Sequence, residues 1–426
     1  MVDCGLFQGS KYAEDLNYNK FPYNPSGIDC VFITHSHADH IGRLPKLVKE
    51  GFGGKIYCTK PTLGLMKRAF PDNWKLIVQE AKDDLHPPLF NEEDIEKTLS
   101  LVEAKSYYEA IDLGGGIYGK FHNAGHIIGS AIVEIGFGGQ KIFFTGDLGN
   151  SPAPLLSNPD FASDADYVVI ESAYGSRIHE DRQRRKDILE DMVEETVARG
   201  GTLMIPSFAI ERTQELLFEL NDLMMNKRIP SLPVFIDSPL AQKMTEVYKE
   251  FPSYLKEEAL KTFESGEGLF EFPGLKFSET VEESKAINDM PPPRVIIAGS
   301  GMSNGGRILH HERRYLSDPK SAILFIGYQV KGSLGRRILD GEPEVKIFGE
   351  KIPIKCHIKA IGGYSAHADQ NQLVNWVEHA KEGGKLKRVF IVQGEEESAT
   401  SLALKLRDNL LIDSTVPNEG DEFEIG

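Results

Sequence analysis

The chain has 426 residues and a formal net charge of −16, from 48 basic and 64 acidic side chains. This length exceeds one ordinary hydrophobic core and predicts two domains. The acidic balance argues against a protein that coats duplex nucleic acid through its overall field, although a locally positive cleft could still bind a polyanion.

The composition also bears on location. No window approaches 18 uninterrupted apolar residues, so we expect no membrane span. The first residues lack the basic and apolar regions of a secretory signal, and the four cysteines are scattered without a C-x-x-C pair. These features predict a cytoplasmic protein without a thiolate zinc site.

Short β-branched and aromatic runs recur along the chain and alternate with amphipathic stretches. The runs predicted as strands are "CVFIT", "AIVEIGF", "KIFFTG", "YVVIES", "GTLMIP", "PVFIDS", "RVIIAG", "SAILFIG" and "RVFIVQG". Helices are predicted over 211–225 and 370–381, where apolar residues follow helical spacing. This alternation indicates a layered α/β fold.

Three longer segments interrupt the alternation. Residues 71–99 are acidic and predict a helical excursion, and residues 251–293 predict another that ends in three prolines. Residues 339–367 alternate like a β-ribbon and return to a histidine-bearing loop.

The stretch "FITHSHADHIG" (32–42) concentrates His35, His37, Asp39 and His40 directly behind an apolar run. Crowded imidazoles repel one another when protonated, and a bound cation makes the crowding favourable. We interpret this stretch as a loop that wraps one ion and offers ligands to a second. Nitrogen and carboxylate ligands without thiolate favour Zn²⁺ or Mn²⁺ in an open site.

Four more polar residues occupy similar places beside predicted strands. Asp147 follows "KIFFTG", Glu171 follows "YVVI", His126 precedes "AIVEI", and His367 follows the predicted ribbon. Side chains at one edge of a sheet converge although they are far apart in sequence, so these four are candidates for the same site.

Taken in order, the motifs resemble the metallo-β-lactamase superfamily and, within it, the β-CASP branch of RNA- and DNA-processing nucleases. They are "VDCG", "THSHADHIG", "AGHIIGSA", "FTGDLG", "ESAYGSR", "IPSFAIERTQELL", "DSPLA", "GSGMSNGGR", "GYQVKGSLGRR", "GGYSAHAD" and "VQGEEES". The resemblance implies an α/β fold: a metallo-β-lactamase αββα sandwich with an inserted α/β β-CASP domain. It places the sandwich at 1–175 and 364–426 and the insertion at 176–363.

The resemblance also assigns roles to residues. It implies that His35, His37, His126 and Asp147 bind one metal, and that Asp39, His40 and Asp147 bind the other, both ions being zinc. A hydroxide activated by two such ions would attack the phosphodiester. His367 resembles the proposed general acid, oriented by Glu171, so that His367, Glu171 and Asp39 form the catalytic set. Asp3 resembles a carboxylate that holds a ligand histidine.

Two departures from the family pattern stand out. Gln393 occupies the place of a histidine that usually binds the second metal, and a glutamine oxygen is a poorer zinc ligand than imidazole. The second metal is therefore expected to be weak, replaced by Mn²⁺, or lost. The family also has about thirty residues before "VDCG", so the chain is expected to lack the first strands of the sandwich.

In the inserted domain, three segments take the form strand, loop, helix, and helix N-termini suit phosphate groups. The resemblance implies that Ser365 lies in the loop that approaches the scissile phosphate, and that Arg212, Arg307, Arg336 and Arg337 contact the substrate backbone in a channel between the insertion and the metal cleft.

The resemblance implies a zinc-dependent phosphodiesterase that acts on single-stranded RNA and leaves a 5′-phosphate on the downstream product. A homodimer would fit the family. Two alternatives stay open: a DNA-processing nuclease of the same branch, and a catalytically weakened RNA-binding paralogue, to which Gln393 would be an early step. Hydrolysis of a small ester or thioester is disfavoured by the insertion. The choice between endo- and exonucleolytic cutting is also open.

Overall fold

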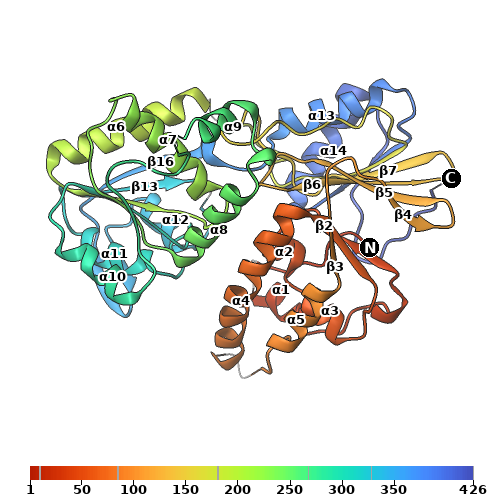
Figure 1. Ribbon diagram of the computed structural model, residues 1–426, viewed down its shortest axis with the longest axis horizontal. Helices are drawn as coiled ribbons and strands as arrows, with labels where there is room; N and C mark the ends of the chain where they lie inside the picture. Colours follow the sequence, from red (N-terminus) through yellow and green to blue (C-terminus); the bar gives the residue numbers. More distant parts are fainter. Residues whose placement is uncertain (9–10, 84–85, 180–181, 267, 328, 426) are drawn as a thin grey trace. The chain divides into compact units, whose positions relative to one another are not determined.

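A computed structural model describes residues 1–8, 11–83, 86–179, 182–266, 268–327 and 329–425. The chain divides into two compact units (Figure 1). Unit 1 comprises Met1–Ile178 and His367–Gly426, and unit 2 comprises His179–Ala366. Within the described residues, no helix has the length and apolar character needed to cross a bilayer.

Unit 1 contains two sheets. The first is wholly parallel, in the order β1-β2-β3, and consists of β1 (Cys30–Phe32), β2 (Lys55–Thr59) and β3 (Val102–Lys105). The second is mixed and has the order β18-β17-β8-β7-β6-β5-β4. Its strands are β4 (Ile111–Gly114), β5 (Ile117–Asn123), β6 (Ala131–Phe137), β7 (Gln140–Phe144), β8 (Tyr167–Glu171), β17 (Arg388–Val392) and β18 (Ser414–Thr415).

The longer helices of unit 1 pack on the outer faces of these sheets, and shorter helices lie in the connections. They are α1 (Lys11–Leu16), η1 (Pro25–Gly27), α2 (Ala38–Ile41), α3 (Leu44–Lys49), α4 (Lys60–Asp83), α5 (Glu92–Ser100), α13 (Gln370–Glu382) and α14 (Glu396–Leu410). One buried cluster joins α3, α4 and α5 to the three-stranded sheet, and another joins α13 and α14 to the seven-stranded sheet.

A third cluster lies between the two sheets of unit 1. It contains Phe32 of β1 and residues of β4, β5 and β6, including Phe121 and Val133. The layers therefore run helix, sheet, sheet, helix. The predicted αββα sandwich is confirmed.

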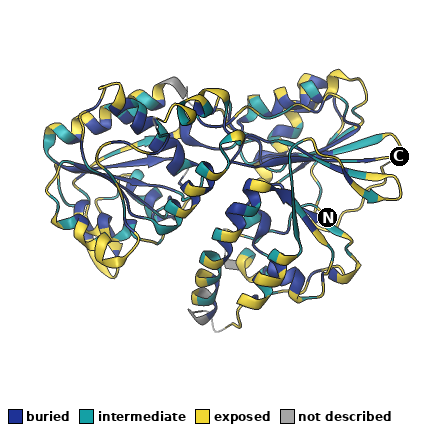
Figure 2. Cartoon of the chain, viewed as in Figure 1, coloured by how far each residue is buried: buried dark blue, intermediate teal, exposed yellow. Residues whose placement is uncertain are grey.

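Unit 2 is built on one parallel sheet, in the order β11-β10-β12-β9-β13-β16. Its strands are β9 (Thr202–Pro206), β10 (Val234–Ile236), β11 (Leu275–Phe277), β12 (Arg294–Ala298), β13 (Ala322–Ile326) and β16 (His357–Ile361). Most of these strands are buried along their length (Figure 2), as expected when helices cover both faces.

The helices of unit 2 lie on both sides of the sheet (Figure 1). They are α6 (Arg182–Arg199), α7 (Arg212–Met225), α8 (Pro239–Glu250), η2 (Pro252–Tyr254), α9 (Glu257–Glu264), α10 (Val281–Ala286), η3 (Ile287–Asp289), α11 (Ile308–Tyr315), α12 (Leu334–Leu339) and η4 (Gly362–Tyr364). The predicted inserted α/β domain is therefore present.

The structure refines the three interrupting segments. Residues 71–83 fall on α4 and residues 92–99 on α5, and residues 86–91 form a non-helical connection, while residues 84 and 85 lie outside the described residues. Residues 251–293 are not purely helical, because β11 forms the edge of the sheet beside β10. The predicted ribbon is correct for the hairpin of β14 (Glu344–Ile347) and β15 (Glu350–Pro353), but β16 joins the main sheet instead. Alternation of apolar and polar residues indicates a strand but does not determine which strand it pairs with.

A buried ion network anchors η4, the turn that precedes Ser365. Nη2 of Arg185 lies 2.7 Å from Oε1 of Glu219, and Nη1 donates to the carbonyl of Gly363 at 3.1 Å. The hydroxyl of Tyr364 donates to the other oxygen of Glu219, and Arg185 lies 4.5 Å from the ring centroid of Tyr364. Arg185 belongs to the run of basic residues 182–186. Its side chain is buried, and these contacts show that it holds α6, α7 and η4 together.

Glu312 of α11 is fully buried, and its carboxyl accepts a hydrogen bond from the hydroxyl of Ser303. Burial raises the pKa of Glu312 from 4.5 to about 8. The folded chain therefore holds a proton that the unfolded chain has released between these pH values. We expect the free energy of unfolding to fall as pH rises from 5 to 9, by roughly 4 kcal/mol from this group.

The measurement is the calorimetric stability of the chain and of Glu312→Gln across that pH range. The variant is expected to lose this share of the pH dependence, whereas Glu258→Gln, an exposed control on α9, keeps it. An unchanged pH slope in Glu312→Gln would show that Glu312 is ionised in the folded state.

Candidate metal centre

The segment between β1 and α2 is held in place by Asp3. The carboxylate of Asp3 accepts from the backbone amide and the hydroxyl of Thr34, both at 2.8 Å, and lies 2.7 Å from Nδ1 of His40. The backbone of Asp3 adopts a positive φ of 57° and its amide donates to the carbonyl of Phe32 at 2.8 Å. Fixing Nδ1 of His40 in this way directs Nε2 toward the cluster.

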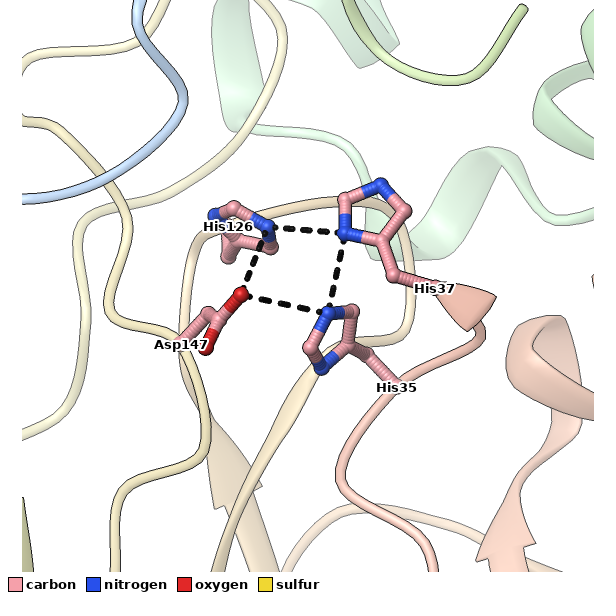
Figure 3. A group of neighbouring side chains, drawn as sticks. All are labelled: His35, His37, His126 and Asp147. Carbon is pink, nitrogen blue, oxygen red and sulfur yellow. Dashed lines mark hydrogen bonds and ion pairs between the residues drawn. The ribbon is translucent and has the colours of Figure 1, made fainter. Parts of the chain in front are cut away.

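Three imidazoles and one carboxylate converge beside this segment (Figure 3). Nε2 of His35 lies 3.0 Å from Nδ1 of His37, and Nε2 of His126 lies 3.3 Å from the same atom. Oδ2 of Asp147 closes the square at 3.4 Å from His35 and 3.5 Å from His126. The sequence-predicted first ligand group is thus brought together with its donor atoms facing one another.

The chemistry of this group fits a cation. Burial, with the nearby charge of His40, holds the pKa of His35 well below its usual range, and burial lowers the pKa of His37 to about 4. Burial alone would raise the pKa of Asp147, but the imidazoles of His40, His367 and His35 hold it well below normal. Neutral imidazoles of His35 and His37 beside an ionised Asp147 are the protonation states that a divalent metal requires.

One atom of this cluster also lacks a hydrogen-bond partner among the described residues, namely the buried Oδ1 of Asp147. That oxygen lies 3.3 Å from Nε2 of His40, on the side of the second ligand group. A buried carboxylate oxygen without a donor is costly unless a cation or a solvent molecule satisfies it. Asp147 is therefore placed to serve both groups.

The second ligand group consists of Asp39, His40 and Asp147. Asp39 and His40 lie in the short helix α2, not in the loop that we predicted, because the chain turns helical directly after His37. Burial would lower the pKa of His40, but the carboxylates of Asp147 and Asp3 outweigh it and raise that pKa well above normal.

Gln393 extends this second group from the end of β17. Its Nε2 donates to Oδ2 of Asp39 at 2.8 Å and lies 3.4 Å from Nε2 of His40. Its backbone has a φ of 52°, and its carbonyl accepts from the amide of Ser172 at 3.2 Å. The residue that departs from the family pattern is therefore within reach of the second group.

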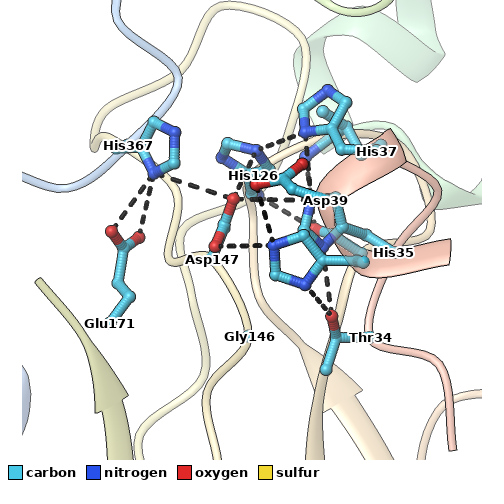
Figure 4. A network of polar contacts seen from close by, with 12 residues as sticks. Thr34, His35, His37, Asp39, His126, Gly146, Asp147, Glu171 and His367 are labelled. Carbon is cyan, nitrogen blue, oxygen red and sulfur yellow. Dashed lines mark hydrogen bonds and ion pairs between the residues drawn. The ribbon is translucent and has the colours of Figure 1, made fainter. Parts of the chain in front are cut away.

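His367 and Glu171 form a pair beside the cluster (Figure 4). Nδ1 of His367 lies 3.3 Å and 3.2 Å from the two carboxylate oxygens of the buried Glu171. The same nitrogen lies 3.8 Å from Oδ2 of Asp147, so that Asp147, Glu171 and His367 could also hold a cation together. Burial raises the pKa of Glu171.

Two glycines permit the close approach of these loops, and sequence reasoning did not single them out. A Cβ on Gly146, whose φ is 53°, would lie 2.6 Å from Cβ of Thr34. A Cβ on Gly149 would lie 2.0 Å from the carbonyl oxygen of Gly125, in the loop that carries His126. Both glycines flank Asp147 in "FTGDLG", which was the available signal.

The predicted substrate-binding residues lie in unit 2, and each arginine has an intramolecular partner. Nε of Arg212 donates to the carbonyl of Tyr364 at 3.2 Å, and Arg307 lies 2.7 Å from the buried carboxylate of Asp237. Arg336 pairs with Asp340 and Arg337 with Glu342 in half-exposed ion pairs, which contribute little to stability. Ser365 is buried, at 1% exposure.

Removing the support of Asp3 is expected to weaken metal binding. We expect Asp3→Asn to lower the affinity of the second ligand group by about 10- to 100-fold, because His40 loses its negative partner. The measurement is metal content after dialysis against graded free Zn²⁺. Asp29→Asn is the control, since this carboxylate lies directly before β1 and outside the cluster. An unchanged affinity in Asp3→Asn would contradict the supporting role.

An αββα sandwich whose loops gather three imidazoles and a shared carboxylate at one edge defines a metallo-hydrolase. Comparison with known families agrees. The metallo-beta-lactamase superfamily matches residues 1–197, the Beta-Casp domain matches residues 213–338, and the Zn-dependent metallo-hydrolase RNA specificity domain matches residues 351–417. The chain belongs to the β-CASP branch of the metallo-β-lactamase superfamily.

Several curated proteins are similar along almost the whole chain. A protein named as a ribonuclease from Thermus thermophilus is 38% identical over 403 residues, covering 94% of this chain and 89% of that protein. An RNase J-like protein from Methanocaldococcus jannaschii is 32% identical, covering 99% of this chain and 92% of that protein. A transcription termination factor FttA from Methanosarcina mazei is 32% identical, and this chain spans 66% of its length.

Proposed function

We propose that the chain is a metal-dependent ribonuclease that hydrolyses phosphodiester bonds of single-stranded RNA. The observation that carries the proposal is the convergence of His35, His37, His126 and Asp147 beside the His367–Glu171 pair. The names of two relatives, a ribonuclease and an RNase J-like protein, support RNA as the substrate. So does the RNA specificity domain that matches residues 351–417.

The residues of the cluster would have separate roles in hydrolysis, and most of them would bind metal. Bound divalent metal would supply a water of lowered pKa and positive charge beside the phosphorus. His35, His37, His126 and Asp147 would hold one ion. Asp39, His40 and Asp147 would hold another, so that Asp147 is shared. This donor set of nitrogen and carboxylate oxygen suits zinc.

His367 would act on the leaving group. With Nδ1 facing the carboxylate of Glu171, the opposite ring nitrogen Nε2 would carry the proton that the departing oxygen takes. Glu171 would fix the orientation of the ring and favour its protonated form. If the departing oxygen is the 3′ oxygen of the upstream nucleotide, the phosphate stays on the 5′ end of the downstream product.

Substrate contacts are proposed for Ser365, Arg212, Arg307, Arg336 and Arg337. Arg336 and Arg337 are the better candidates among these, because their exposed partners Asp340 and Glu342 cost little to exchange for phosphate. Arg307 is engaged by three contacts, to Asp237 and to the carbonyls of Ser278 and Glu279.

The test compares end-labelled single-stranded RNA and DNA of the same sequence, with Zn²⁺ or Mn²⁺ present. We expect chelator-sensitive cutting of the RNA and little or none of the DNA. Equal cutting of both strands would make the chain a general nuclease, and cutting of DNA alone would overturn the proposal. Fragment lengths from 5′- and 3′-labelled RNA would then separate endonucleolytic from exonucleolytic cutting.

Gln393 would affect which metal ion the second ligand group binds and how tightly. Rotation of its amide would turn Oε1, in place of Nε2, toward Asp39 and His40, and this oxygen would favour a harder cation such as Mn²⁺. We propose that the second group binds metal more weakly than the first. Metal titration of the chain and of Gln393→His tests this, and equal affinities in the two proteins would contradict it.

A further inference from the structure

A cavity of about 510 Å³ opens in unit 1 between the end of β17, the first turns of α14 and the segment that follows β18. Its apolar wall includes Ile391, Ala399, Val416 and Pro417. Its volume lies in the range of small-molecule sites and exceeds what one nucleobase needs.

This cavity adjoins the second ligand group at Gln393. Gln393 lines the cavity, and its amide donates to the carboxylate of Asp39 at 2.8 Å. A group bound in the cavity would therefore lie one residue away from the second ligand group. A substrate that spans the metal centre would meet the cavity at a neighbouring nucleotide.

The residues that line the cavity determine which kind of chemical group could bind in it. The described residues around the cavity include the carboxylate of Glu396, the amides of Gln393 and Asn418 and the hydroxyl of Thr400, but no lysine, arginine or histidine. A phosphate would face a negative charge without a compensating cation, so the backbone of a nucleic acid is disfavoured there. A neutral, flat group with N–H donors would be favoured, its faces against the apolar wall and its edge toward Glu396.

Guanine meets these requirements best among the RNA bases, because adenine and cytosine each present their amino group beside a ring nitrogen whose lone pair would face the carboxylate. Its N1–H and N2–H₂ groups lie side by side on the Watson–Crick edge and can both donate to one carboxylate, whereas uracil offers a single imide N–H between two carbonyl oxygens. Single-stranded RNA presents such edges because its bases are not paired. Backbone amides at the start of α14, which have no carbonyl partner within the helix, could meet the O6 acceptor.

We propose that this cavity is a base-binding subsite that receives a guanine flanking the scissile phosphodiester, with Glu396 as the residue that recognises it. The proposal rests on the proposed ribonuclease function and adds a sequence preference to it. Glu396 would thus be a specificity-determining residue, separate from the residues that carry out cleavage.

The first test measures nucleoside binding directly, by ligand-observed NMR on the metal-loaded chain with guanosine or uridine. We expect guanosine to bind at least tenfold more tightly than uridine, and Glu396→Gln to lose that difference. Val416→Trp, which would place a large side chain in the cavity from a partly exposed wall position, is expected to weaken guanosine binding as well. Glu397→Gln is the matched control, an exposed neighbour on α14 that does not line the cavity.

The second test uses uridine-rich RNA with one guanosine placed at successive positions around the cut. We expect one flanking position to lower KM about tenfold, and Glu396→Gln to reduce that ratio toward one. Equal binding of both nucleosides, or an unchanged preference in Glu396→Gln, would overturn the subsite. Absence of RNA cleavage with guanosine binding intact would instead count against the ribonuclease proposal and leave the base site standing.

Discussion

Replacing Asp147 with alanine is expected to abolish RNA cleavage, with a loss of more than about a thousandfold in kcat. The carboxylate belongs to both ligand groups, since Oδ2 faces His35 and His126 while Oδ1 faces His40. Its removal would also leave imidazoles crowded without a negative partner. The metal content of the purified variant should fall together with activity.

The control for this variant is Asp408→Ala, because Asp408 is a mostly exposed carboxylate on α14 that pairs with its neighbour Arg407. It should retain metal and activity. Circular dichroism on both proteins separates a lost site from a lost fold. Near-normal turnover by Asp147→Ala would be incompatible with a site in which one carboxylate serves two ions.

Replacing His367 with alanine is expected to slow cleavage by about 10²- to 10⁴-fold while leaving metal content intact, because the proposed role of His367 is proton transfer. A phosphodiester with a nitrophenolate leaving group needs little protonation, so its hydrolysis should fall much less than that of RNA. The pH–rate profile should also lose the decline at high pH that reports the acid.

His367 could instead be a metal ligand, since Asp147, Glu171 and His367 lie close enough to hold a cation. Loss of metal from His367→Ala, with equal damage to both substrates, would make His367 a ligand and exclude it as the acid. His357→Ala, at an exposed position on β16, controls for the loss of an imidazole elsewhere.

The candidate metal site was largely predictable, because its ligand residues are recognisable from their residue types and their close spacing in the sequence. His35, His37, Asp39 and His40 lie within six positions after an apolar run, and Asp147 follows β7 and His126 precedes β6 as predicted. Imidazoles are rarely crowded without a reason, so the pattern could be interpreted without knowing the fold. The placement of Asp39 and His40 on α2 was missed, because a four-residue helix has too few residues to show a period.

Other features depend on contacts that local sequence does not reveal. The strand β11 has only three residues, so alternation could not identify it. Arg185 lies in a run of basic residues, a pattern common on solvated faces, but its partners Glu215 and Glu219 lie about thirty residues further along, on α7. The contact between Gln393 and Asp39 spans 354 positions in the sequence, and Gln393 follows β17, which is positioned by pairing with the distant strand β8.

The central claim is that RNA cleavage depends on metal held by the histidine and aspartate cluster. The most direct measurement removes metal by dialysis against a chelator, then follows cleavage of end-labelled single-stranded RNA as Zn²⁺ or Mn²⁺ is restored in measured amounts. We predict that the stripped chain does not cut, and that activity returns in proportion to bound metal. Cleavage by the stripped chain at the same rate, with no metal detectable, would contradict the account.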